Sequence, residues 1–162
     1  MENIFNDILA KLKTDVPEIA WIDIDEQQFE AFGEAAPVAY PCVLVGFPGA
    51  NYSQIGKGQQ IAEVNVQIRV AFRVYERFNA DVPEQFKTAA FEHFTILRKV
   101  MKAVHLLASA TGLYTSLMRI NWTKDASIDP KIYTINYKCG VKDEAIGRTY
   151  TTQLVEELII NK

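Results

Sequence analysis

The chain has 162 residues, of which 49% are hydrophobic and 23% charged, and its formal net charge is −3. These values are typical of one folded domain with its own core and exclude a disordered chain. The negative charge argues against binding nucleic acid by general phosphate neutralisation. No stretch approaches the roughly 20 apolar residues of a membrane span, and the N-terminal sequence lacks the positive charge of a secretory signal. We therefore expect a protein made and kept in a cytoplasm, with no specific nucleic acid and no membrane as partner.

The first forty residues predict a helix followed by a short strand. Apolar residues at helical spacing favour an amphipathic helix over residues 2–13, with Ile4, Phe5, Ile8, Leu9 and Leu12 on one face. Pro17 should end this helix, because proline disrupts a helix interior. Residues 19–24 alternate enough to form a short strand, whereas residues 27–39 mix helical and loop signals and stay unassigned.

The clearest pattern is the alternation in Glu63–Tyr75, which reads EVNVQIRVAFRVY. One face of this predicted strand is apolar and should be core: Val64, Val66, Ile68, Val70, Phe72 and Val74. The other face carries Arg69 and Arg73 and should meet solvent or a partner. An apolar strand over residues 41–47 precedes it. The polar residues 51–60 between them are predicted to form a long, glycine-containing hairpin loop.

After the alternating strand, residues 86–108 predict the longest helix, with Gly112 as its stop. Its apolar stripe would cover the apolar face of the sheet. Two further strands are expected over residues 114–122 and 132–141. In the first, one face should hold Tyr114, Ser116, Met118, Ile120 and Trp122.

These elements predict an α+β fold: an antiparallel sheet of about four to five strands, a long amphipathic helix packed on one face, and an N-terminal helix. Residues 1–145 are expected to form a single domain. Residues 146–162 form a C-terminal tail that would either dock or extend as an arm. An apolar patch there would be sticky if exposed, and consists of Leu154, Val155, Leu158 and Ile159.

No residues form a recognisable catalytic, cofactor-binding or metal-binding pattern, so we expect no enzyme. The loop around Lys57 does not match a phosphate-binding loop. Asn51 stands at the position of the first glycine, Gly58 replaces the serine or threonine, and a strand is expected where the motif has a helix. His93 and His105 lie about 120° apart around one helix and cannot share a metal unaided. Asp25 and its acidic neighbours break the calcium-loop pattern and should form a solvated turn. Cys42 and Cys139 lie in apolar segments and should be reduced, buried thiols.

The order of elements resembles the tail terminator, or tail completion, proteins of tailed bacteriophages and prophages. The features that carry this resemblance are the proline-entered strand PCVLVGF, the Gly58-Gln59-Gln60 turn before the alternating strand, and the closing strands RINWTKD and KIYTINYKCGVKDE. The resemblance covers most of residues 1–145. The longer apolar tail from Gly147 departs from it.

The resemblance implies a structural virion protein that assembles in the bacterial cytoplasm. Such proteins form rings, usually hexamers, that cap the tail tube and join it to the head–neck connector. The implied partners are therefore other copies of the chain, the tail tube protein and the connector protein. The residues expected to make contacts are Tyr52, Gln54, Lys57, Gln59, Gln60, Arg69, Arg73, Leu154, Leu158 and Ile159.

Two other classes of protein fit the same pattern of elements. One is a small-ligand-binding or enzymatic α+β domain with a pocket between helix and sheet, which would place His93 or His105 beside a polar partner in a cavity. The other is an adaptor that joins proteins by pairing at a sheet edge. A packed helix–sheet seam would favour the structural interpretation.

Overall fold

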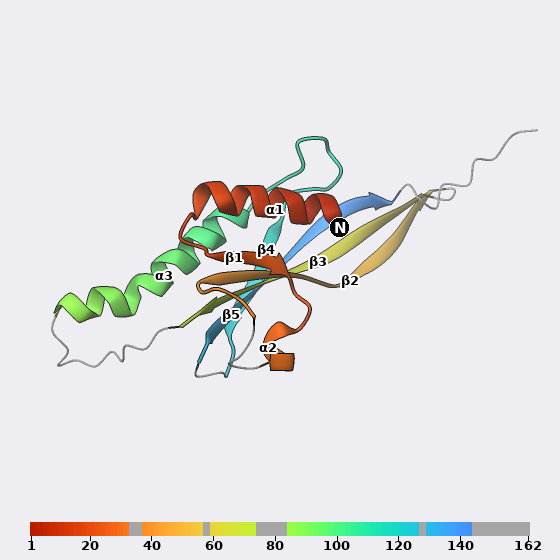
Figure 1. Cartoon of the computed structure of the whole chain (residues 1–162). Helices are drawn as coiled ribbons and strands as arrows, with labels where there is room; N and C mark the ends of the chain where they lie inside the picture. The colour runs from red at the N-terminus through yellow and green to blue at the C-terminus, as the bar shows by residue number, and fades with distance from the viewer. Residues whose placement is uncertain (33–36, 57–58, 74–83, 127–128, 144–162) are drawn as a thin grey trace, which may run out of the picture.

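The computed structural model describes residues 1–32, 37–56, 59–73, 84–126 and 129–143. These residues form an α+β fold in which helices pack on a five-stranded sheet of order β1-β2-β3-β5-β4 (Figure 1). The elements are α1 (Glu2–Asp15), β1 (Trp21–Ile24), α2 (Gln28–Phe32), β2 (Cys42–Gly56), β3 (Gln59–Phe72), α3 (Glu84–Val104), β4 (Met118–Lys124) and β5 (Lys131–Asp143). In the described part of the chain, no helix is both long and apolar enough to cross a membrane.

The sheet is mixed, whereas the sequence predicted an antiparallel one. Three of its four strand pairs are antiparallel, but β1 runs parallel to β2, with Trp21 opposite Cys42. The reason lies in the connection. The chain leaves β1 and passes through α2 before it enters β2, and such a crossover can return a strand in the same direction.

β3 is the central strand, and its predicted apolar face is buried. It pairs with β2 on one side and with β5 on the other, so that Ile68 lies between Val45 and Ile135. Ile68 and the apolar residues at even positions beside it, from Val64 to Phe72, are at most 3% exposed. The strand ends at Phe72, and Val74 and Tyr75 lie outside the described residues.

Two helices cover this apolar face. Ile4, Ile8 and Leu12 of α1 are buried in the same core as Val100 and Val104 of α3. α1 extends two residues beyond the predicted helix, and the expected N-terminal helix is confirmed. The cover is therefore shared, and is not provided by a single helix as predicted.

α3 ends four residues earlier than predicted. Leu106 has a left-handed backbone conformation, with φ 65°, which stops the helix just after Val104. The Leu106 amide donates to the carbonyl of Leu117, and the Leu117 amide donates to the carbonyl of Leu107. These bonds direct the chain towards β4. Of the predicted apolar stripe, the side chains of residues 84–90 lie outside the described residues.

The predicted loop over residues 51–60 is mostly strand. Asn51 pairs with Glu63, Ser53 with Ile61, and Gln54 with Gln60, so β2 and β3 form a long hairpin (Figure 1). Its polar, glycine-containing sequence was interpreted as a loop because neither face is apolar. Backbone pairing alone extends the strands here. The register shifts between Gly46 and Gly49, around Pro48, which cannot donate a backbone hydrogen bond.

β4 is shorter than the predicted strand and is exposed along its whole length. Its register with β5 shifts between Arg119 and Asn121, so Ile120 is an extra residue in the pairing. This bulge reverses the alternation of side chains. As a result Arg119, opposite Tyr137, shares a face with Trp122, whereas Met118 lies on the other face. The single apolar face predicted for residues 114–122 is therefore wrong.

Candidate interaction surfaces

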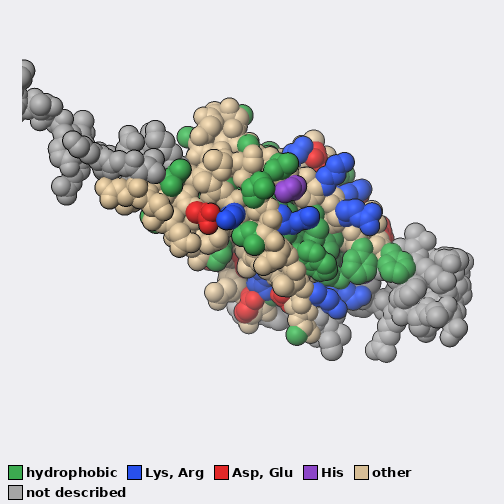
Figure 2. Space-filling model, turned by 180° about the vertical axis from the view of Figure 1, so that it is seen from behind, with side chains coloured by type: hydrophobic (Ala, Val, Ile, Leu, Met, Phe, Trp, Pro, Cys, Tyr) green, Lys and Arg blue, Asp and Glu red, His purple; other side chains and the backbone are tan. Residues whose placement is uncertain are grey.

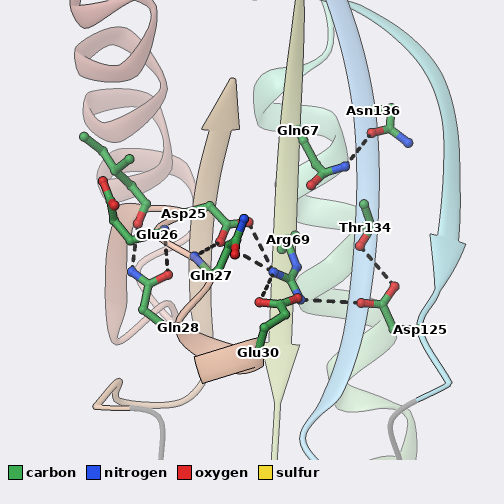
Figure 3. A network of polar contacts seen from close by, with 11 residues as sticks. Asp25, Glu26, Gln27, Gln28, Glu30, Gln67, Arg69, Asp125, Thr134 and Asn136 are labelled. Atoms are coloured by element: carbon green, nitrogen blue, oxygen red, sulfur yellow. Dashed lines mark hydrogen bonds and ion pairs between the residues drawn. The ribbon is translucent and has the colours of Figure 1, made fainter. Parts of the chain in front are cut away.

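Arg69 lies at the centre of a polar network on the sheet face opposite α1 and α3 (Figure 3). Its side chain is 8% exposed and forms ion pairs with Asp25 at 3.3 Å, Glu30 at 2.7 Å and Asp125 at 3.7 Å. The guanidinium also lies 5.0 Å from the centre of the Phe29 ring. Arg69 therefore joins the middle of β3 to α2 and to the turns that follow β1 and β4.

A second, smaller core surrounds this network. Phe29 packs there with four buried residues of the sheet, namely Cys42, Leu44, Ala71 and Ile132. The polar face of the alternating strand is thus covered at this end, and Arg69 makes its contacts within the chain. The prediction that Asp25 lies in a solvated turn is wrong, since its side chain is 9% exposed and paired with Arg69.

Glu30 is expected to stabilise the chain at neutral pH and to lose this effect in acid. Its hydrogen bond to Arg69 lowers the pKa of the carboxyl below the ordinary value of 4.5. A carboxylate with a lowered folded-state pKa contributes stability that is fully present above the unfolded value and is lost as the pH falls through the folded value. Glu30→Gln should therefore be less stable than the parent at about pH 7, and the difference should shrink as the pH falls through the pKa of the folded carboxyl.

Urea unfolding of the parent and Glu30→Gln chains across this pH range would measure the effect. Glu63→Gln is the control for loss of an exposed ion pair, because Glu63 contacts Lys138 at 3.1 Å with both side chains about half exposed. A stability difference between Glu30→Gln and the parent that stays constant with pH would contradict the prediction.

The β2–β3 hairpin carries several of the predicted contact residues. Tyr52 is 56% exposed, Gln54 is exposed and Gln60 is partly exposed. Gln59 begins β3, but its side chain lies outside the described residues, as does Lys57 altogether. Arg73 follows the end of β3, where it is exposed and its guanidinium lies 4.9 Å from the centre of the Tyr40 ring. The contact role of these residues stays a prediction.

An apolar groove lies between α3 and β4, which we call the α3–β4 groove. It has a volume of about 480 Å³ and is lined by Phe91, Phe94, Thr95, Leu97, Arg98, Met101 and Trp122. Phe91 is 46% exposed, Phe94 40% and Trp122 50%. Burial of large aromatic side chains dominates many protein interfaces, so their joint exposure indicates a contact surface.

Basic residues border this groove on both sides. Arg98 and Lys102 are exposed and one helical turn apart on α3, while Arg119 and Lys124 are exposed on β4 and share the face of Trp122. Figure 2 shows the molecule from behind, and on this face a hydrophobic patch lies between groups of Lys and Arg side chains. The surface thus combines an apolar floor with a cationic rim. β4 also forms one edge of the sheet, because no described strand lies beyond it.

The described residues do not assemble a recognisable reactive centre. Among them, no group of three or more His, Cys, Asp or Glu side chains is placed to hold a metal ion. His93 is 5% exposed and packs against the rings of Phe72, Phe94 and Tyr133, in the seam between α3 and the sheet. His105 is exposed after the end of α3. Neither histidine lines the α3–β4 groove.

The two cysteines are free and buried, as predicted. Burial raises the pKa of the Cys42 thiol to about 12 and that of Cys139 to about 11. Since the thiolate is the nucleophile and metal ligand, both thiols are unreactive at neutral pH in the folded chain.

Leu154, Leu158 and Ile159, the remaining predicted contact residues, lie outside the described residues. The α3–β4 groove and the role of Arg69 as the centre of an internal network were not predicted. The groove has a partial signal in the sequence: Trp122 stands within a strand between Arg119 and Lys124, an apolar side chain among cations.

No protein-family model matches this chain, and no curated protein matches it. A search of solved structures found a chain from a structure titled "Virion of native gene transfer agent (GTA) particle". The two chains are 14% identical, with a TM-score of 0.43, over 85% of this chain and 92% of that chain. The functional proposal therefore depends on the residues of this chain.

Proposed function

We propose that this chain is a structural component of a tailed phage-like virion, of the tail terminator kind, and that it works as a ring. The observation that carries the proposal is the α3–β4 groove. Its exposed aromatic side chains, at the open edge of the sheet, are the chemistry of a protein contact. The element order resembles that of tail terminator proteins, and this resemblance is the reason for proposing a ring on a tail tube.

The packing of the helix–sheet seam supports the same proposal. Leu97, Val100 and Val104 of α3 are at most 4% exposed and pack in one core with Ile68 and Ile135. These side chains fill the seam beneath α3, and the groove that opens beside the seam, between α3 and β4, is lined by neither His93 nor His105. His93, the candidate residue for a ligand pocket between helix and sheet, is enclosed by aromatic rings.

The predicted partners would use two different surfaces. In a ring, one surface of each copy meets a different surface of the next, and the α3–β4 groove is suited to be one of them. The β2–β3 hairpin, with exposed Tyr52, is suited to reach the tail tube protein or the connector protein. The proposed ring is a hexamer.

Electron microscopy of the chain mixed with assembled tubes of tail tube protein would test the proposal. We expect rings at tube ends and a lower exposed fraction of Tyr52, measured by oxidative footprinting. Tyr52→Ala should weaken capping, whereas Thr14→Ala, on the exposed end of α1, should not. A chain that stays monomeric and ignores the tube protein would contradict the proposal.

A further inference from the structure

We propose that the α3–β4 groove of one copy binds the C-terminal segment of another copy, residues 154–159. This inference deepens the proposed function, because it assigns one contact of the ring. The segment reads LVEELI and so combines apolar residues with two adjacent acidic ones, Glu156 and Glu157. The groove offers the complementary chemistry, an apolar floor bordered by cations.

The cations on the rim are available for such a partner. Arg98 and Lys102 on α3 make no ion pair with another described residue, in contrast to Lys99, which is paired with Glu18. Arg98 lines the groove, Lys102 lies one turn further along α3, and Arg119 and Lys124 share the face of Trp122, so this surface has a local positive charge in a chain whose net charge is −3. An apolar partner without acidic residues would leave these charges unpaired beside a contact. The sequence LVEELI satisfies both requirements.

The tail is long enough to reach a groove, and its assignment to the groove of another copy follows from the proposed ring. β5 ends at Asp143, opposite Gln60, whereas Trp122 in the groove pairs with Ile135, near the start of β5. From Ile135 to Asp143 the strand covers roughly 26 Å, at about 3.3 Å per residue. Leu154 lies eleven positions beyond Asp143, and eleven residues can span at most about 36–40 Å, which is enough to cover this distance.

A copy-to-copy contact of this kind is heterologous, since the tail of one subunit meets the groove of the next. Heterologous contacts produce closed rings when the rotation between subunits closes. Each subunit then contributes one tail and one groove, so every groove in a closed ring is occupied.

A charge exchange in the full chain tests the proposal. Glu156→Lys/Glu157→Lys gives a basic tail, and Arg98→Glu/Lys102→Glu gives an acidic rim. Each variant alone should require an about tenfold or higher concentration to self-associate, because two attractive pairs become repulsive. A mixture of the two variants should recover association, since the basic tail fits the acidic rim and the acidic tail fits the basic rim.

Mass photometry and sedimentation over a range of concentrations and salt would measure association. The matched control for the basic-tail variant is Glu2→Lys/Glu26→Lys, which makes the same change in net charge at exposed positions outside the groove and should associate like the parent. Leu158→Asp tests the apolar part, and should weaken association at high salt as well.

Three results would overturn the inference: variants that associate like the parent, a mixture no better than either variant, or a parent chain that is monomeric throughout. The proposed function can fail separately. If the charge exchange works but the parent chain does not cap tail tubes, the tail–groove contact stands and the terminator function is refuted. If a variant without the contact still forms rings on tubes, the terminator function stands and the tail–groove contact is refuted.

Discussion

Ile68→Asp is expected to unfold the chain. Ile68 is 0% exposed at the centre of β3, between Val45 on β2 and Ile135 on β5, beneath the helices. An unpaired carboxylate there would have no water and no cation, and the cost of at least about 4 kcal/mol is comparable to the whole stability of a typical domain. Circular dichroism and size exclusion should show loss of the cooperative fold.

Ile61→Asp is the matched control for this substitution. Ile61 lies on the same strand but is 39% exposed, so its change should cost no more than about 1 kcal/mol. Ile68→Ala gives a measurable intermediate, with an expected loss of about 2–5 kcal/mol of unfolding free energy. A folded Ile68→Asp chain with nearly parental stability would contradict the packing of α1 and α3 on this face.

Arg69→Met is expected to reduce the free energy of unfolding by about 3–5 kcal/mol, because it leaves a buried carboxylate without its cation. The cost should come mainly from Asp25, which is 9% exposed, and less from Glu30, which is 53% exposed. Denaturant unfolding measures the loss. As a control, Lys138→Met removes the exposed ion pair between Lys138 and Glu63, and should cost at most about 1 kcal/mol of unfolding free energy.

A double-mutant cycle would separate the ion pair from general packing. Asp25→Asn removes the charge but keeps the side-chain oxygen that accepts a hydrogen bond from the Gln27 backbone amide at 3.0 Å. In the Arg69→Met background this second change should restore part of the lost stability, since no buried charge then remains at residue 25. Additive losses from the two substitutions would show that the ion pair contributes nothing of its own.

The main features of the fold follow from periodic apolar patterns in the sequence. Alternation identified the buried face of β3 from Val64 to Phe72, and helical spacing identified α1. Patterns of this kind report which side chains leave water, so they predict strands with one apolar face well. They fail where pairing occurs without burial. The distal part of β2, from Asn51 to Gly56, is a strand with polar faces, and its sequence is indistinguishable from a loop.

The contact surfaces were harder to predict because they depend on residues far apart in sequence. Arg69 is buried by Asp25, Glu30 and Asp125, which come from three separate segments, and no local pattern shows that they meet. The bulge at Ile120 likewise moves Arg119 to the face of Trp122, which reverses the alternation on which the prediction relied. Composition identified the sticky tail, but not the groove that we propose for it.

The long β3 places the two proposed contact regions at opposite ends of one rigid element. Near one end Val70 pairs with Tyr133 beside the groove, and near the other Gln60 pairs with Asp143 next to the hairpin. Ten residues of strand, roughly 33 Å, separate these pairs. Changes at sites this far apart are usually additive. Substitutions in the hairpin should therefore alter what a ring attaches to without altering its subunit number, so mutation can change attachment and assembly separately within one small protein.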